Sequence, residues 1–152
     1  MYDPTAQQIT NAVVHALKTQ RMELELALKL IRQAEEEARR INTPMVLSVV
    51  DEGGNLVALH RMDDSLLASI AISQAKAYTA AALRIPTTEA AKLVLPGQSL
   101  YGLQETHPGK FCVFGGGEPV VVNGRCIGGL GVSGGTADQD SAVAHAAVTA
   151  ER

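Results

Sequence analysis

The chain has 152 residues, of which 46% are hydrophobic, and a formal net charge of −3. This size and composition predict a single domain over residues 1–152, with a hydrophobic core of its own. The 13 basic residues are dispersed, which excludes a nucleic-acid surface, because phosphate binding requires clustered Lys and Arg. No apolar run approaches the roughly 18 residues of a membrane span, and the polar N-terminus lacks a signal-peptide pattern. We therefore expect a cytoplasmic protein with no membrane partner.

The first 43 residues are expected to form two amphipathic helices. Apolar residues recur at helical spacing over residues 5–18, within an N-terminal helical segment of about residues 1–20. A second helical pattern covers residues 24–41 and ends before Pro44. It is apolar on more than one side, so it must be covered on more than one side, by the first helix or by a neighbouring subunit.

The middle of the chain predicts a hairpin followed by helices. Two β-prone runs, residues 45–50 and 56–62, flank a turn cluster. An alanine-rich helix is expected over residues 66–84, and its small side chains allow close approach to whatever it packs on. A short helix over residues 89–95 and an irregular loop over residues 96–110 follow.

Residues 111–136 contain nine of the 14 glycines of the chain. A short strand is predicted over residues 111–114, and Asn123-Gly124 predicts the two-residue turn of a second hairpin. Glycine is unfavourable in strands, so either a ligand or another backbone is expected to come close there; ordinary turns and bulges are the alternative. A capping box, Thr136 with Gln139, opens a last helix over residues 137–150. Together these elements predict an α+β domain built on an antiparallel sheet.

The glycine-rich region offers one candidate binding site. Gly129 to Gly134 matches GxGxxG, but a dinucleotide fold needs this motif within a βαβ unit, and no further strand is expected after it, so the sequence disfavours a dinucleotide fold. The backbone N–H groups of residues 133–136 precede a helix and could bind a small anion; plain helix capping is the alternative. Arg61 and Lys76 are the cations expected near such an anion. Pairing with Asp51, Asp63 or Asp140 is the rival role for these two residues.

The histidines and cysteines show no metal-binding spacing. His15 lies off the apolar face of its helix, and an accessible histidine can be an axial haem ligand; a solvated surface histidine is the alternative. Cys112 and Cys126 form no CxxC motif, which predicts small apolar core residues and excludes covalent c-type haem.

Six segments together resemble the GlcG/HbpS family, which includes the C-terminal domain of PduO-type proteins. They are VLSVVDEGGNLV (46–57), HRMD (60–63), SIAISQAKA (69–77), PGQSLYGLQ (96–104), FGGGEPV (114–120) and IGGLGVSGGTADQD (127–140). The resemblance implies a profilin-like fold with a five-stranded antiparallel sheet flanked by helices, and homo-oligomers that are often octamers. It also implies haem binding, through a histidine in PduO-like members, and a place in haem handling or in corrinoid and propanediol metabolism.

The resemblance further implies a set of site residues. His15 is the nearest counterpart of the haem-binding histidine. The pocket residues that lie inside matched segments are Asp51, Arg61, Lys76, Gly116, Gly117, Ser133, Gly134, Gly135 and Asp140. No adenosyltransferase domain is present, so that activity is not carried over.

These observations lead to one main hypothesis and two alternatives. The main hypothesis is a homo-oligomeric protein that binds haem, or a corrinoid, with Arg61 or Lys76 holding a carboxylate of the ligand. The first alternative is an enzyme or accessory factor acting on a small carboxylate or hydroxy acid, with Asp51 or His60 as proton acceptor. The second is a structural assembly subunit without a ligand.

Overall fold

The computed structural model describes residues 4–18 and 21–150 and confirms the α+β class. The elements are α1 (Pro4–Lys18), α2 (Leu24–Arg40), β1 (Val46–Asp51), β2 (Leu56–Arg61), α3 (Ser69–Leu83), α4 (Thr87–Leu93), α5 (Leu103–Thr106), β3 (Gly117–Val122), β4 (Arg125–Ser133) and α6 (Ala137–Thr149).

Both predicted hairpins form, and together they make one antiparallel sheet of order β2-β1-β4-β3. Asn123 and Gly124 connect β3 to β4 with φ angles of 50° and 76°, the left-handed conformation that a two-residue hairpin turn requires. The first turn is held by Asp51, whose Oδ1 accepts from the backbone N–H groups of Gly53 and Asn55, each at 2.9 Å.

The strand predicted over residues 111–114 does not form, and the described residues contain a four-stranded sheet rather than a five-stranded one. The backbone N–H of Cys112 donates to the hydroxyl of Thr79 at 2.8 Å, so this stretch is attached to α3 instead of to a strand ladder. The profilin-like relationship stays a prediction.

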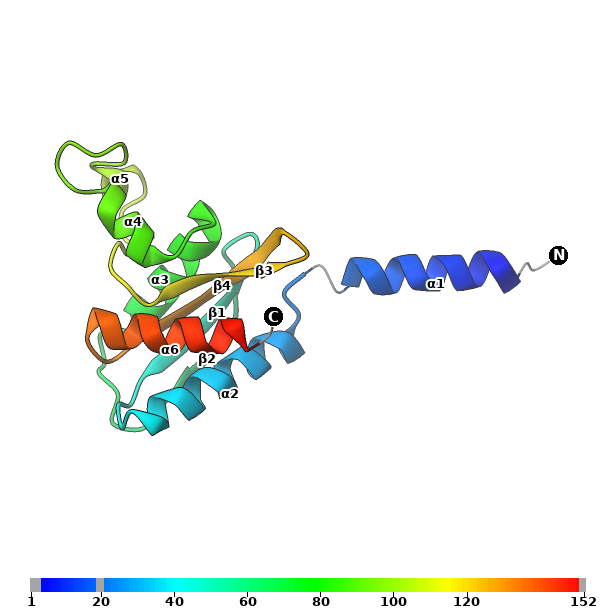
Figure 1. Cartoon of the computed structure of the whole chain (residues 1–152), viewed down its shortest axis with the longest axis horizontal. Coiled ribbons are helices and arrows are strands. Elements are labelled where there is room, and N and C mark those ends of the chain that lie inside the picture. The colour runs from blue at the N-terminus through cyan, green and yellow to red at the C-terminus, as the bar shows by residue number, and fades with distance from the viewer. Residues whose placement is uncertain (1–3, 19–20, 151–152) are drawn as a thin grey trace.

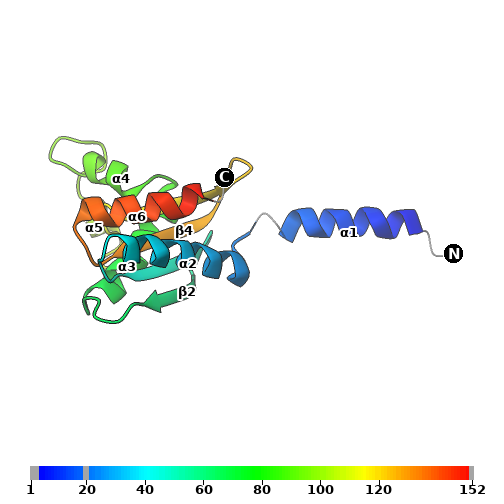
Figure 2. The ribbon, with the colours of Figure 1, turned by 60° about the horizontal axis from the view of Figure 1, so that its bottom comes forward.

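Helices cover both faces of the sheet (Figures 1 and 2). α2 and α6 pack on each other and on one face, and α3 packs on the other. The α2/α6 side holds most of the hydrophobic core, in which strand residues with large side chains meet the buried stripe of α2. The core residues on β1 and β4 are Leu47, Val49, Ile127, Leu130 and Val132.

The face that meets α3 explains the glycines of β4. Along this strand, Leu130 and Val132 belong to the core on the α2/α6 side, whereas the alternating Gly129 and Gly131 meet the α3 backbone. A Cβ atom at Gly131 would collide with the backbone carbonyl oxygen of Ser73, and one at Gly129 with that of Ala77. The predicted close approach is therefore real, but the partner is the chain's own alanine-rich helix rather than a ligand or a second subunit.

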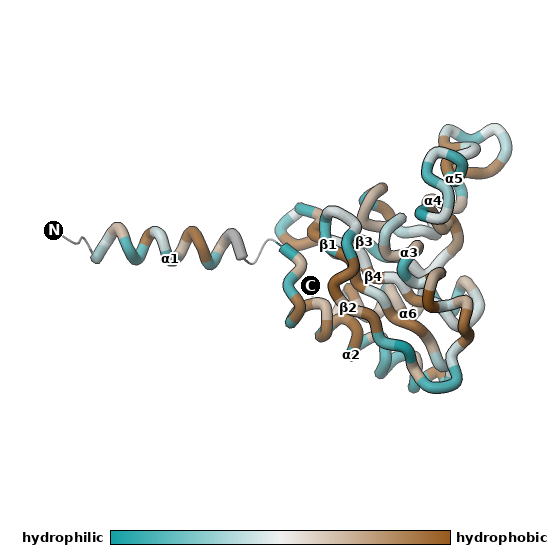
Figure 3. The backbone as a smooth tube through the Cα atoms, turned by 180° about the vertical axis from the view of Figure 1, so that it is seen from behind, coloured by the Kyte–Doolittle hydropathy of each residue, from teal (hydrophilic) through white to brown (hydrophobic). Residues whose placement is uncertain are grey.

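α1 projects away from the sheet and its helices (Figures 1 and 2). Hydrophobic and hydrophilic residues alternate along it (Figure 3), and Ile9 and Val13 are 60% and 51% exposed. Across the described residues, no helix is both long and apolar enough to cross a bilayer.

Candidate functional site

Two adjoining hollows lie over the outer side of α3, and we call them together the α3 groove. Their volumes are about 450 Å³ and about 440 Å³, and both are lined by Ala71, Ala75 and Gly109. The first is also lined by Val50, Gly54, Asn55, Leu56, Gln74, Tyr78 and Lys110, and the second by Ile72, Gln104, Phe111, Cys112, Val113 and Phe114.

One side of α3 packs on the sheet, and the opposite side forms the floor of the groove. Ser73, Ala77 and Ala80 are fully buried towards the sheet, while Ala71 and Ala75 line the groove. Residues four apart lie one above the other on a helix, so these two alanines form a shallow strip along the outer side. Small side chains there leave space that larger ones would fill.

Aromatic rings form the walls of the groove. Tyr78 on α3 packs edge-on against Phe111, with ring centroids 5.7 Å apart. Phe114 lines the second hollow and is 47% exposed. The sequence has only five Tyr and Phe residues in total, and three of them meet here. A concave, mainly apolar site with a few polar groups is the usual form of a small-molecule site.

Cys112 lines the second hollow and is buried, as the sequence predicts. Burial raises the pKa of the Cys112 thiol, because the thiolate would be poorly solvated there. A hydrogen bond from the Phe114 backbone and the charge of Lys76 oppose this shift in part. The thiol therefore acts as an apolar wall of the groove at neutral pH.

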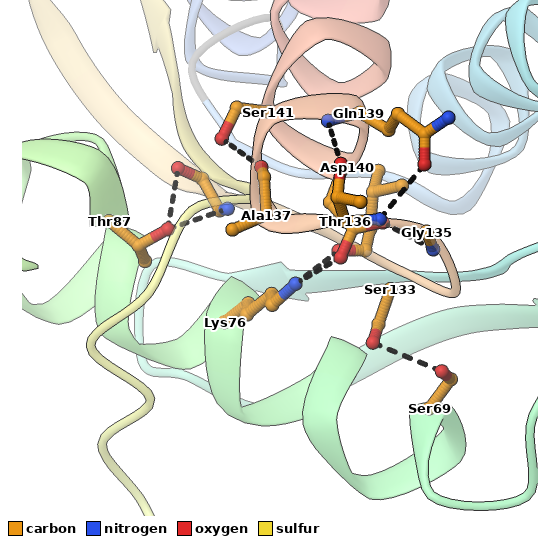
Figure 4. A network of polar contacts seen from close by, with 12 residues as sticks. Ser69, Lys76, Thr87, Ser133, Gly135, Thr136, Ala137, Gln139, Asp140 and Ser141 are labelled. Atoms are coloured by element: carbon orange, nitrogen blue, oxygen red, sulfur yellow. Dashed lines mark hydrogen bonds and ion pairs between the residues drawn. The ribbon is translucent and has the colours of Figure 1, made fainter.

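A buried ion pair lies behind Phe114. The ammonium group of Lys76 is 2.6 Å from Oδ2 of Asp140 and donates to the carbonyl oxygen of Val132 at 2.9 Å (Figure 4). It also lies 5.0 Å from the centroid of the Phe114 ring. Lys76 is fully buried, so in this structure it takes the rival role that the sequence allows, pairing with Asp140.

The predicted anion site at the start of α6 is occupied by the chain's own side chains (Figure 4). The backbone N–H of Gly135 donates to Oδ1 of Asp140 at 2.9 Å. The N–H of Thr136 donates to the side chain of Gln139, and the N–H of Gln139 donates to the hydroxyl of Thr136, which confirms the capping box. An incoming carboxylate would have to displace these groups.

Gly116 and Gly117, both predicted site positions, lie against Lys76 of this ion pair. A Cβ atom at Gly116 would lie 2.8 Å from the Lys76 ammonium, and one at Gly117 would lie 2.5 Å from the Lys76 carbonyl oxygen. Ser133 is buried and donates to the hydroxyl of Ser69 at 3.1 Å. Gly134 packs against the backbone of residues 44–45. These positions seat α3 and α6 on the sheet.

The remaining predicted residues lie elsewhere. Arg61 and Ser133 flank Val46 at one end of β1, whereas Asp51 is at the opposite end, beside Gly128. Arg61 is exposed. His15 is exposed on α1, the helix that projects away from the sheet.

The structure gives His60 a partner on α2. Its Nδ1 lies 2.7 Å from Oε1 of Glu35, and neither residue of this pair lines the groove. In the part of the chain that is described, no three His, Cys, Asp or Glu side chains are grouped as a metal site.

Tyr78, Lys110 and Phe111, which line the groove, and His107, whose ring contacts Tyr78 and Phe111, were not among the candidates from the sequence. They come from α3 and from a loop that the sequence indicates only as irregular. The sequence alone does not reveal their importance, because the three aromatic rings near the groove are up to 36 positions apart and meet only after folding. A signal within the sequence was the run from His107 to Phe114, which contains a histidine, a lysine and two phenylalanines.

Comparison with known proteins gives consistent results. The sequence profile of HbpS-like haem-degrading proteins matches residues 22–149. The chain is 50% identical over 125 residues to an uncharacterised 15.0 kDa protein of the dhaT-dhaS intergenic region of Citrobacter freundii, covering 82% of this chain and 88% of that protein. It is 42% identical over 122 residues to the corrinoid adenosyltransferase PduO of Salmonella typhimurium, covering 80% of this chain. It spans only 36% of the length of PduO. A crystal structure of a PduOC–haem complex matches with a TM-score of 0.82 at 39% identity, over 86% of this chain and 94% of that one.

Proposed function

Because this chain belongs to the family of HbpS-like haem-degrading proteins, we propose that it binds haem and that the haem lies in the α3 groove. The observation that carries the proposal is the groove itself, with its alanine floor and aromatic walls. The similarity to the PduOC–haem complex supports the choice of ligand.

The residues of the groove fit the chemistry of haem. Haem has a broad apolar ring, which suits the strip of Ala71 and Ala75 and the rings of Phe111 and Phe114. Its two carboxylates require cations or water, and Lys110 lines the first hollow. A larger cavity, of about 670 Å³, is a poorer fit, because charged residues such as Arg84, Arg125 and Glu52 line it. When bound, haem supplies an iron centre with axial positions for ligands.

His15 remains the axial ligand proposed from the family resemblance. α1 projects away from the groove of its own protomer, so His15 would serve a groove only in another copy of the chain. A corrinoid is the second tetrapyrrole proposed for the groove, and full-length PduO activity is not implied by the part that this chain spans.

We also propose that the protein is a homo-oligomer, with an octamer as the expected assembly. The exposed apolar side chains of α1, Ile9 and Val13 among them, support self-association, since an amphipathic helix normally covers its apolar face. Light scattering of the full chain, and of an Ile9→Lys/Val13→Lys variant that should dissociate if α1 contributes, tests this.

The small-acid alternative has less support. Lys76 and the N–H groups at the start of α6 are already paired within the chain. Asp51 caps its own hairpin turn, and His60 pairs with Glu35. A small carboxylate would therefore have to compete with existing intrachain contacts rather than complete an open site.

Titration with haemin tests the proposal. Wild-type protein should give a saturable Soret shift, and Ala75→Phe, which fills the floor of the groove, should weaken binding by about tenfold or more. Ala82→Phe is the matched control, because Ala82 is exposed on the same stretch of chain but lines a different cavity. If the wild type shows no saturable shift, or if both variants bind as the wild type does, haem does not occupy the α3 groove. Cobinamide in place of haemin tests the corrinoid.

A further inference from the structure

His107 lies at the rim of the α3 groove, just after α5, among aromatic rings. Its ring packs edge-on against Tyr78, with centroids 6.0 Å apart, and against Phe111, with centroids 6.5 Å apart. Tyr78 and Phe111 line the two hollows of the groove, so His107 contacts a wall of each. These contacts limit the orientations of an otherwise exposed imidazole.

The two ring nitrogens of His107 have different surroundings. Nδ1 lies 3.5 Å from the hydroxyl of Tyr78, at the long limit of a hydrogen bond. Among the described residues, Nε2 has no partner. An imidazole that is held through one nitrogen and leaves the other open is the usual arrangement of a metal-binding histidine, because the hydrogen bond fixes the tautomer and the orientation.

Lys110 adds a cation three residues further along the same loop. Its ammonium group lies 5.4 Å from the centroid of the Tyr78 ring, and it lines the first hollow. No salt bridge joins it to a carboxylate of the described residues. By contrast Lys92, an exposed lysine on α4, pairs with Glu89 at 2.8 Å. Lys110 is therefore a cation beside an apolar groove with no acid of its own.

From this arrangement we infer that His107 supplies an axial nitrogen to the iron of a tetrapyrrole in the α3 groove, and that Lys110 pairs with one of its carboxylates. The inference rests on the proposed function, and it assigns both contacts to residues of the protomer that forms the groove. It differs from the assignment of His15, which needs a second copy of the chain.

Two probes separate the roles of the two residues. Haemin carries iron and two carboxylates, and iron-free protoporphyrin IX carries the same ring and carboxylates without the metal. His107→Ala should weaken haemin binding by about tenfold and shift the Soret maximum, and leave protoporphyrin IX binding unchanged. Added imidazole should restore the wild-type haemin spectrum in this variant. Lys110→Gln should weaken both probes alike, and should have no effect on the binding of protoporphyrin IX dimethyl ester.

Control variants keep the inference separate from the proposed function. His145→Ala removes another exposed histidine and should leave the haemin spectrum of the wild type in place. If wild-type protein binds neither porphyrin, the proposed function fails. If it binds both, and His107→Ala or His107→Gln gives the wild-type haemin spectrum and affinity, the inference about His107 is overturned. Equal haemin binding by Lys110→Gln and wild type overturns the role of Lys110.

Discussion

The ammonium group of Lys76 lies 2.6 Å from the carboxylate of Asp140, although 64 positions separate the two residues in the chain. This contact joins α3, on one face of the sheet, to the first turn of α6, on the other. Asp140 also accepts from the Gly135 N–H, so a single carboxylate holds the lysine and the loop before α6 together. Neither charge is exposed to solvent to any useful extent.

Lys76→Met should destabilise the fold by about 3–5 kcal/mol, because it leaves the Asp140 carboxylate buried without its partner. Urea denaturation measures this loss. Lys92→Met is the matched control, since Lys92 pairs with Glu89 at the surface, and it should cost less than about 1 kcal/mol. A double variant, Lys76→Met with Asp140→Leu, should recover much of the lost stability. Equal losses for the two single lysine variants would show that the buried pair does not stabilise the fold.

Gly131→Ala should destabilise the fold by about 3 kcal/mol or more, because its Cβ would collide with the Ser73 carbonyl oxygen and force α3 off the sheet. Backbone atoms cannot rotate away as a flexible side chain can. Gly124→Ala is the comparison. A Cβ atom there would have open space around it, so the variant should lose only the roughly 1–2 kcal/mol that a positive φ angle costs a residue with a side chain. Thermal and urea unfolding of the two variants should rank them in that order. The reverse ranking would mean that α3 and the sheet are not tightly seated.

Cys112 should make the stability of the protein depend on alkaline pH. Burial raises the pKa of its thiol in the folded state, so above about pH 8.5 the unfolded chain loses the proton first. Ionisation then favours the unfolded chain, and stability falls as the pH rises towards the folded pKa. Cys112→Ala should show a smaller loss between pH 7 and pH 10 than the wild type in urea denaturation. Cys126→Ala should lose as much stability over this pH range as the wild type does. If Cys112→Ala also loses as much stability as the wild type, the Cys112 thiol is not the source of the pH dependence.

Local sequence patterns correctly predicted the turns, caps and hairpins that form between residues close together in the sequence. Asn123-Gly124 has the conformation that its turn needs, and Thr136 and Gln139 cap α6 as their spacing indicates. Both hairpins were predicted because each one pairs two strands that are adjacent in the sequence. The prediction of a strand at residues 111–114 was wrong. The backbone N–H of Cys112 donates a hydrogen bond to Thr79, a residue on α3 more than 30 positions away, instead of to a neighbouring strand.

The candidate site was harder to predict because it is assembled from distant segments. The glycines of β4 correctly indicated a close approach, but glycine alone carries no information on what approaches it. The partner became clear only when Ser73 and Ala77 were placed over the strand. Likewise, Tyr78 and Phe111 have no shared pattern in the sequence, and their contact creates a wall of the groove.

The backbone of α3 packs directly on the glycines of β4. One side of the helix therefore has no space for larger side chains, whereas the other side faces the groove. Ser73 and Ala77 are fully buried, and their backbone lies against the glycines of β4, so larger side chains at these two positions have no free space. Ala71, Ala75 and Tyr78 face no such barrier, and a single exchange among them reshapes the hollow without disturbing the sheet. A few positions on one helix and the loop facing it therefore set the shape of the hollow, on a scaffold that stays the same.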